Sequence, residues 1–161
     1  MLQKYFSHYR PIITIVLALT LSYSSWSQTA LFTDVPVSDI GTSNGIGQAN
    51  TSRNIAIDNN GFIYVVFSGS DGVRVAKSEN RGASFLPSIQ VSSDTFTEPE
   101  IAVNNQGLVF VAWANTSGNV LLSRSIDGGV SYSIPSQINS VATFAASVHM
   151  ATFNNNVYIV C

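Results

Sequence analysis

Residues 125–132 read Ser-Ile-Asp-Gly-Gly-Val-Ser-Tyr, and residues 78–85 carry a degraded copy, Ser-Glu-Asn-Arg-Gly-Ala-Ser-Phe. We call them the downstream motif and the upstream motif; they begin 47 positions apart. Internal similarity at a fixed period of about 20 to 50 residues is typical of proteins built from stacked units, because one unit cannot bury its apolar face alone. The motif pair therefore predicts a repeat fold.

The repeat extends beyond the two motifs. Residues 54–67 align with residues 100–113 at a constant offset of 46, and the offset becomes 47 after Asn119. This single-residue insertion falls in a polar segment, and loops tolerate insertions. A third copy begins near Met150 and runs to Val160. The sequence therefore predicts two units and the start of a third.

Each unit is expected to form four antiparallel strands. In the first unit the expected strands cover residues 54–58, 62–67, 73–78 and 84–91. Asn and Gly at 59–61 favour a turn, because both residue types accept positive φ. Outside the N-terminal segment no stretch shows sustained helical periodicity with start and stop signals. We predict an all-β fold of four-stranded antiparallel blades, a β-propeller fragment; the alternative, a β-sandwich, does not explain the regular spacing.

These patterns divide the chain into an N-terminal part and a propeller part. We expect a signal peptide at 1–27, a lead-in segment at 28–52, and an incomplete propeller at 53–161 with blades at 53–98 and 99–146 and a partial blade at 147–161. The lead-in has the composition of a loop, although residues 30–37 could form a strand that closes a later blade. Since propellers close with four to eight blades, we expect the sequence to be a piece of a larger assembly.

The N-terminal residues resemble an export signal. Lys4 and Arg10 precede an apolar run from Ile12 to Leu21, and Ser25 and Ser27 suit cleavage after residue 27. The alternative, a membrane anchor, needs about 20 apolar residues. We therefore expect a secreted, periplasmic or cell-surface product with no stable membrane insertion after cleavage.

The composition excludes several classes of function. The net charge is −2 with 10% charged residues, which argues against nucleic acid, because such binding rests on phosphate neutralisation by Lys and Arg. Cys161 is the only cysteine, so the sequence contains no disulfide pair. There is no phosphate-binding glycine-rich loop and no metal-ligand spacing. We expect neither a cofactor nor a metal site.

The downstream motif resembles the Asp box, or BNR repeat, of sialidase-like β-propellers. The pattern S-x-D-x-G-x-[ST]-[WYF] is matched by Ser125, Asp127, Gly129, Ser131 and Tyr132, and the upstream motif keeps Ser78, Gly82, Ser84 and Phe85, with Asn80 in place of the aspartate. The resemblance covers about residues 53–160. It implies that the motifs are structural turns between third and fourth strands, on the face away from the substrate.

Residue chemistry agrees with a structural role for the motif. Asp127 can accept hydrogen bonds from backbone N–H groups in a tight turn, and Gly128 and Gly129 supply conformations closed to other residues. Asn80 can still accept one such bond. We expect Tyr132 to begin the fourth strand and to wedge between blades, and we assign no catalytic or metal-binding role to Asp127.

The resemblance also indicates where a ligand would bind. Sialidases of this fold are similar in using three arginines to clamp a carboxylate, a tyrosine activated by glutamate, and an aspartate. The usual setting of the first arginine is missing; Arg53 is the nearest candidate by position, with a solvated strand entrance as the alternative. The loops opposite the motifs provide the candidate ligand residues Arg53, Asp71, Asp94, Glu98, Glu100 and Asn115.

Two of these candidates carry an alternative interpretation. Glu98 and Glu100 would project from the same side of an extended segment and could form a functional pair. Pro99 between them is equally consistent with a plain turn at the entry to the blade. His149 precedes the third inner strand and has no clustered partner at a ligand spacing, so we interpret it as a hydrogen-bonded structural histidine.

Three functions remain open at this point. The first is an exported propeller that binds a glycan or an extracellular protein through the loops opposite the motifs, without catalysis by this segment. The second is an exo-α-sialidase or related glycoside hydrolase whose catalytic residues lie mostly downstream. The third is a purely structural module of a larger secreted protein.

Overall fold

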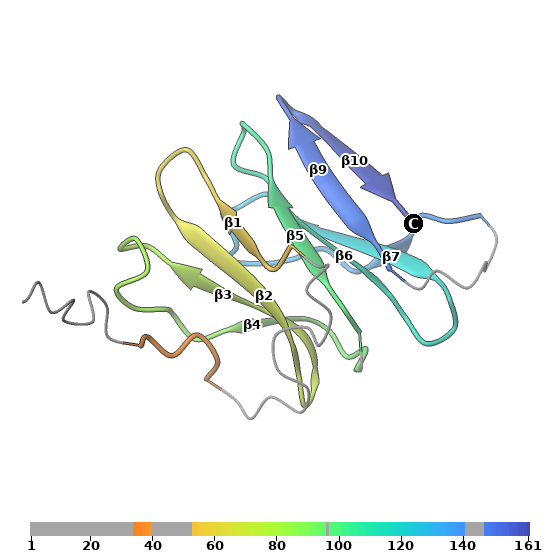
Figure 1. Ribbon diagram of the computed structural model, residues 1–161, viewed down its shortest axis with the longest axis horizontal. Coiled ribbons are helices and arrows are strands. Elements are labelled where there is room, and N and C mark those ends of the chain that lie inside the picture. The colour runs from red at the N-terminus through yellow and green to blue at the C-terminus, as the bar shows by residue number, and fades with distance from the viewer. Residues whose placement is uncertain (1–33, 40–52, 96, 141–146) are drawn as a thin grey trace, which may run out of the picture. The chain divides into compact units, whose positions relative to one another are not determined.

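The computed structural model describes residues 34–39, 53–95, 97–140 and 147–161. The chain divides into units 1–34 and 35–161, and almost all described residues belong to the second unit. They form ten strands and no helix (Figure 1). The strands are β1 (Ile55–Ile57), β2 (Ile63–Gly69), β3 (Gly72–Ser78), β4 (Ile89–Ser92), β5 (Glu100–Val103), β6 (Val109–Ala114), β7 (Val120–Ser125), β8 (Ser136–Gln137), β9 (His149–Phe153) and β10 (Asn156–Val160).

The strands form three antiparallel sheets in simple chain order. The first sheet has the order β1-β2-β3-β4, the second β5-β6-β7-β8, and the third consists of β9 and β10. The predicted all-β fold of repeated four-stranded antiparallel sheets is therefore confirmed, and the open arrangement is consistent with a propeller fragment. Residues 34–39, the described part of the lead-in segment, contain no strand. The expected signal peptide lies outside the described residues.

Strand register shows that the sheets are equivalent. Ala56 pairs with Tyr64 in the first sheet, and Ala102 pairs with Phe110 in the second. These pairs are related by the offset of 46 found in the sequence. Side chains alternate between the two faces of a strand, so the offset also carries each residue of the first sheet to the matching face of the second.

Each sheet packs one face against the next sheet along the chain. We call the face that points toward the following sheet the forward face, and the opposite one the rear face. Tyr64, Val66 and Val73 on the forward face of the first sheet form one core cluster with Val111 and Trp113 on the rear face of the second. Full burial of each such side chain stabilises the fold by about 1.5–3 kcal/mol, so neighbouring sheets depend on one another.

A second core joins the second and third sheets. The forward-face residues Ala102, Phe110 and Ala112 pack with Met150, and Ile159 adds to the cluster from β10. Strand β6 is consequently buried on both faces. Strand β2 is also buried on both faces, as the continuous apolar sequences of both strands predict.

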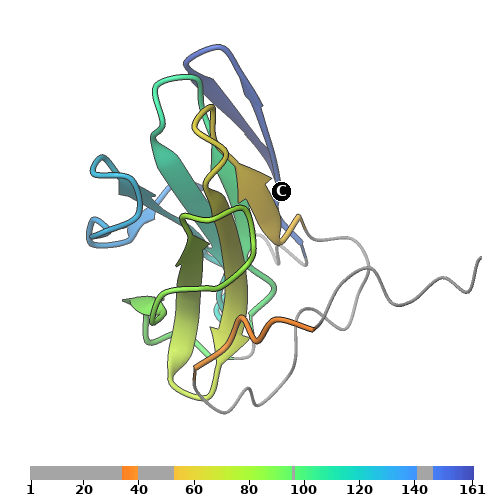
Figure 2. The same cartoon turned by 90° about the vertical axis from the view of Figure 1, so that its left-hand side faces the viewer.

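The first strands of the three sheets, β1, β5 and β9, lie side by side, as Figures 1 and 2 show. Hydrogen bonds link their ends directly. Ile101 N donates to Arg53 O at 3.0 Å, and Asn105 N donates to Asn154 O at 3.0 Å. Asn59 Nδ2 also donates to Asn105 O at 3.2 Å. These contacts fix the positions of successive sheets along their inner edge.

The outer strands begin later than expected. β4 begins at Ile89 and not at Ser84, and β8 begins at Ser136 and not at Tyr132. Prolines explain the delay, because Pro87 and Pro135 lack the N–H that a strand ladder needs. The segment before each outer strand is therefore held to its sheet by single backbone contacts, from Leu86 N to Lys77 O and from Ser133 N to Arg124 O, both at 2.8 Å.

Candidate ligand-binding end of the sheets

The downstream motif forms a turn at one end of the second sheet. Asp127 Oδ1 accepts hydrogen bonds from Ser125 Oγ (2.7 Å), Ser131 N (2.9 Å) and Val130 N (3.1 Å), and Asp127 Oδ2 accepts one from Ser131 Oγ (2.5 Å). Gly129 N donates to Ser125 Oγ at 2.8 Å. Hydrogen bonds from Ser131 and Ser125 hold the pKa of the Asp127 carboxyl below its usual range. Hydrogen bonds within the turn therefore engage both oxygens of the Asp127 carboxylate.

The upstream motif forms the same turn with an amide. Asn80 Oδ1 accepts from Ser84 N and Ser78 Oγ, both at 2.9 Å, and Gly82 N donates to Ser78 Oγ at 2.8 Å. Asn80 Nδ2 donates to Ser84 Oγ at 2.8 Å. In the downstream motif the serine hydroxyl is the donor instead, from Ser131 Oγ to Asp127 Oδ2. The expectation that Asn80 preserves the turn agrees with these contacts.

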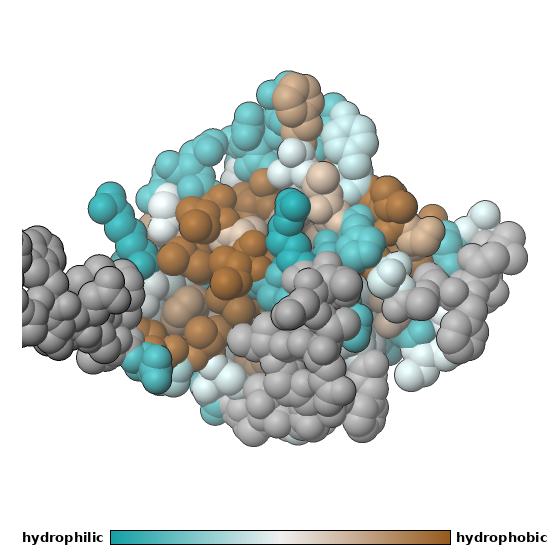
Figure 3. All heavy atoms as spheres, in the orientation of Figure 1, coloured by the Kyte–Doolittle hydropathy of each residue, from teal (hydrophilic) through white to brown (hydrophobic). Residues whose placement is uncertain are grey.

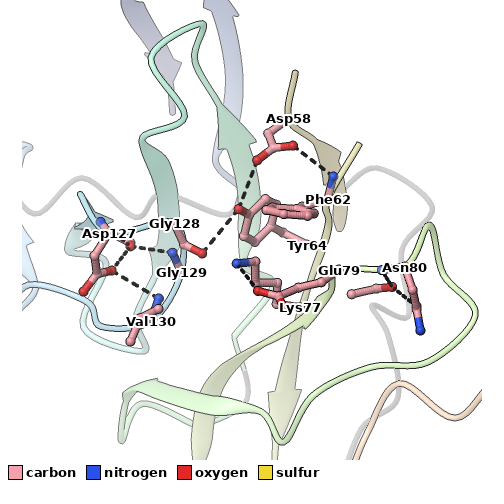
Figure 4. A network of polar contacts seen from close by, with 12 residues as sticks. Asp58, Phe62, Tyr64, Lys77, Glu79, Asn80, Asp127, Gly128, Gly129 and Val130 are labelled. Carbon is pink, nitrogen blue, oxygen red and sulfur yellow. Dashed lines mark hydrogen bonds and ion pairs between the residues drawn. The ribbon is translucent and has the colours of Figure 1, made fainter. Parts of the chain in front are cut away.

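The downstream motif also touches the first sheet (Figure 4). Tyr64 Oη lies 3.3 Å from both Gly128 O and Asp58 Oδ2, so its single proton serves one acceptor at a time. Burial raises the pKa of the Tyr64 phenol, and the Asp58 carboxylate adds to the shift. Tyr132 packs against the same core although it lies in no strand. This end of the sheets is occupied by contacts that join neighbouring units.

Lysine and aromatic side chains complete this end of the first sheet. Lys77 Nζ lies 4.6 Å from the centroid of the Phe62 ring and 2.8 Å from Glu79 Oε1 (Figure 4). A cation over an aromatic face contributes about 0.5–1 kcal/mol where solvent reaches it. Phe62 directly precedes β2 and Glu79 directly follows β3, so both contacts of Lys77 lie within the first unit.

The opposite end carries a buried carboxylate where three units meet. Glu100 begins β5 and is only 2% exposed. Glu100 Oε1 accepts from Arg53 N at 3.1 Å and lies 3.0 Å from His149 Nδ1, and Oε2 accepts from Met150 N at 2.6 Å. One carboxylate thus contacts the starts of the first, second and third units.

Charge and exposure differ sharply within this group. A buried carboxylate without partners costs several kcal/mol, and the two N–H donors and the imidazole offset that cost for Glu100. The His149 side chain is 51% exposed, and Arg53 is exposed. Arg53 contacts the buried carboxylate through its backbone N–H, and both Arg53 and the His149 imidazole are accessible to solvent. We call Arg53, Glu100 and His149 the inner-strand triad.

Asp94 anchors the loop that leads from the first sheet to the second. Trp113 Nε1 donates to Asp94 Oδ2 at 2.8 Å, and Ser92 Oγ donates to the same oxygen at 2.9 Å. Trp113 is fully buried, so its indole N–H needs this acceptor. Asp94 holds its loop against the second sheet.

Two other candidates are used within their own loops. Asp71 Oδ2 pairs with Arg74 Nη1 at 2.8 Å beside the β2–β3 turn. Asn115 Oδ1 accepts from Ser117 N at 3.0 Å and Asn119 N at 3.1 Å in the β6–β7 turn.

Arg74 links Asp71 to the outer edge of the first sheet. Arg74 Nε donates to Ser88 Oγ and Nη2 donates to Ser88 O, both at 2.7 Å. Ser88 also donates to the Asp39 carboxylate through its backbone N at 3.0 Å and through its hydroxyl. The Ser88 hydroxyl lowers the pKa of Asp39. No sequence pattern indicated this contact, because Asp39 lies 49 residues from Ser88.

Of the six predicted ligand residues, the structure brings Arg53 and Glu100 together. Glu98 is half-buried two residues before Glu100. The structure adds His149, which sequence reasoning treated as structural. Its position at the start of the third inner strand, which is the place of Glu100 in the second unit, was the signal that could have identified it.

Searches for related proteins gave one structural likeness. No family model matches the sequence, and no curated protein matches it. The chain is similar to the crystal structure of the intramolecular trans-sialidase from Ruminococcus gnavus in complex with oseltamivir carboxylate, with a TM-score of 0.48 and 18% sequence identity. The match covers 55% of this chain and 19% of that chain, so this chain matches only a minor part of that structure. A likeness of this extent carries no argument about function.

Two further results concern the described residues. They contain no group of three or more His, Cys, Asp or Glu side chains placed to hold a metal ion. Within the same residues, no helix has the length and apolar character needed to cross a membrane.

Proposed function

We propose that this chain is part of an exported sialidase-like Asp-box propeller and that it binds an acidic glycan at the end of the sheets that carries the inner-strand triad. The observation that carries the proposal is the buried Glu100 carboxylate, which contacts the backbone N–H of Arg53, the backbone N–H of Met150 and the imidazole of His149. Arg53 and His149 remain exposed at the same strand starts. Both side chains can donate hydrogen bonds to an anionic group.

Arginine is the reason for favouring an acidic ligand. A guanidinium presents paired N–H donors that match a carboxylate or sulfate in two parallel hydrogen bonds. Arg53 is exposed. Arg74, which lies in β3 near the β2–β3 turn, is instead engaged by Asp71 and Ser88. An acidic protein surface offers similar groups and is the second ligand class.

The environments of Glu100 and Asp127 favour binding over catalysis. Glu100 is buried with both oxygens in hydrogen bonds, and Asp127 is saturated by its own turn at the other end. A glycosidase needs an accessible acid and a nucleophile beside the same bond. The exo-sialidase alternative therefore depends on residues supplied from elsewhere, and the purely structural alternative requires no ligand at all.

Calorimetric titration with 3′-sialyllactose and with neutral lactose tests the proposal. We expect sialyllactose to bind more tightly than lactose, and Arg53→Ala to weaken that binding by about tenfold or more, the loss of one charge-assisted contact. Arg124→Ala is the matched control, because Arg124 is an exposed arginine on β7. Equal affinity for the two sugars, or equal loss in both variants, would contradict the proposal. Release of sialic acid from a fluorogenic sialoside would support the enzymatic alternative.

A further inference from the structure

His149 can act on a ligand in two opposite ways, as a hydrogen-bond donor or as an acceptor. The difference matters because the inner strand of the first unit offers a ligand little polar surface. The exposed side chains of β1 are Ile55 and Ile57, and Figure 3 shows hydrophobic residues gathered over the first sheet. Ligand selection at the inner-strand triad therefore depends on Arg53 and on which ring nitrogen of His149 carries hydrogen.

Glu100 decides which nitrogen that is. Its side chain is buried, and its two oxygens accept hydrogen bonds from Arg53 N at 3.1 Å and from Met150 N at 2.6 Å. A carboxylate has only acceptors, so a further polar group in contact with it must be a donor. His149 Nδ1 lies 3.0 Å from Glu100 Oε1. A neutral imidazole has a single N–H, and beside Glu100 that hydrogen belongs on Nδ1.

The other ring nitrogen, Nε2, is then left for a ligand. Among the described residues no hydrogen bond involves His149 Nε2, and the His149 side chain is 51% exposed. In the Nδ1–H tautomer Nε2 has a lone pair and no hydrogen. The neutral ring can therefore accept a hydrogen bond from a ligand but cannot donate one.

We propose that Glu100 fixes His149 as the Nδ1–H tautomer and that His149 Nε2 accepts a hydrogen bond from a hydroxyl group of the ligand. This role rests on the proposed function, because it concerns the same site and the same ligand. Arg53 N and His149 Nδ1 contact the same oxygen of Glu100, so the two residues are neighbours and act on one sugar residue.

The two neighbours together define the class of ligand. Arg53 binds a carboxylate, whereas His149 requires a group that donates hydrogen. A sugar acid carries both, because hydroxyl groups surround its carboxylate. A peptide rich in aspartate or glutamate meets only the first requirement, so the site favours a sugar acid over an acidic protein surface.

Nitrogen-15 correlation spectra of the imidazole rings test the tautomer without any ligand. At about pH 8, where an ordinary histidine is neutral, we expect His149 to show a protonated Nδ1 and an unprotonated Nε2. His8 is the other histidine of the sequence, and His8→Gln assigns the signals. Glu100→Gln should abolish the preference, with Glu98→Gln as the matched control. A wild-type ring that is mainly Nε2–H overturns the proposal, whether or not Glu100→Gln folds.

Calorimetric titration with 3′-sialyllactose tests the acceptor. His149→Lys keeps a donor for Glu100 but has no acceptor, and we expect it to weaken binding ~5-fold, the loss of one hydrogen bond. His149→Gln keeps both a donor and an acceptor and is the matched control, which should stay within ~2-fold of wild type. Circular dichroism of both variants checks that the β structure is retained.

Two results distinguish this role of His149 from the proposed function. If His149→Lys binds 3′-sialyllactose as tightly as wild type or more tightly, His149 acts as a donor to the anion; the proposal is then overturned while the proposed function stands. If the wild-type chain binds 3′-sialyllactose no better than lactose, the proposed function fails and the hydroxyl contact fails with it, whichever tautomer the spectra show.

Discussion

Gly129 of the downstream motif lies directly against the ring of Tyr64 in the preceding sheet. A Cβ built at position 129 would lie 2.9 Å from Tyr64 Cε1 and 3.3 Å from Cδ1. Distances under 3.0 Å essentially never occur for real Cβ atoms, so the glycine permits the two units to approach. The repeat motif therefore has a role in stacking as well as in its own turn.

Gly129→Ala should destabilise the fold by about 2–4 kcal/mol, combining the strain of positive φ with the forced displacement of Tyr64. Gly107→Ala is the matched control, since Gly107 also has positive φ but no atom lies within 4 Å of its added Cβ. We expect the control to cost about 1 kcal/mol. Urea denaturation of both variants measures the difference, and equal losses would contradict the close approach.

Tyr132→Phe should leave stability unchanged or raise it by about 1 kcal/mol, because the buried Tyr132 hydroxyl has no hydrogen-bond partner among the described residues and its burial is costly. The upstream motif already has Phe85 at this position. Tyr64→Phe should instead destabilise, since the Tyr64 hydroxyl contacts Asp58 and Gly128. Thermal unfolding of the pair checks this, and a greater loss in Tyr132→Phe would contradict it.

Glu100→Gln should destabilise the protein by about 2–4 kcal/mol. The two carboxylate oxygens accept hydrogen bonds from the backbone N–H groups of Arg53 and Met150, and in glutamine one of these oxygens is replaced by an N–H₂ donor that cannot accept. Glu98→Gln is the control, because the same change two residues earlier affects a half-buried side chain. We expect it to stay within about 0.5 kcal/mol of wild type. Similar denaturation midpoints for both variants would show that Glu100 does not join the three units.

Asp127 should make stability depend on pH in acid. Its pKa is lowered in the folded state, so its stabilising effect is complete above the ordinary value of 3.8 and is lost as the pH falls through the lower folded value. Asp127→Asn removes this titration while retaining the turn, as Asn80 does in the upstream motif. The wild-type unfolding temperature should fall more than that of the variant between about pH 6 and about pH 2. Parallel pH curves would contradict the assignment.

The sequence predicted the sheets well because their signal is local. The alignment of residues 54–67 with 100–113 anticipated the paired inner strands, and the Ser, Asp and Gly pattern anticipated the turn around Asp127. The starts of β4 and β8 were missed because the motif aromatic residues favoured a strand, whereas Pro87 and Pro135 interrupt the ladder after them.

The candidate site was predicted only in part because its contacts are long-range. Glu100 was identified from its position at the start of an inner strand, but its contact with His149 spans 49 residues. The contact of Tyr64 with Gly128 spans 64 residues. Such contacts depend on how sheets stack, and strand periodicity within one unit contains no information about that.

The central claim is that each sheet is covered by its successor through a fixed pair of faces. Nuclear Overhauser effects from the Tyr64 ring protons test it most directly. We predict strong effects to the α protons of Gly129, in the following unit, and none to those of Gly82, in the same unit. Strong effects to Gly82 with none to Gly129 would contradict the stacking of the sheets.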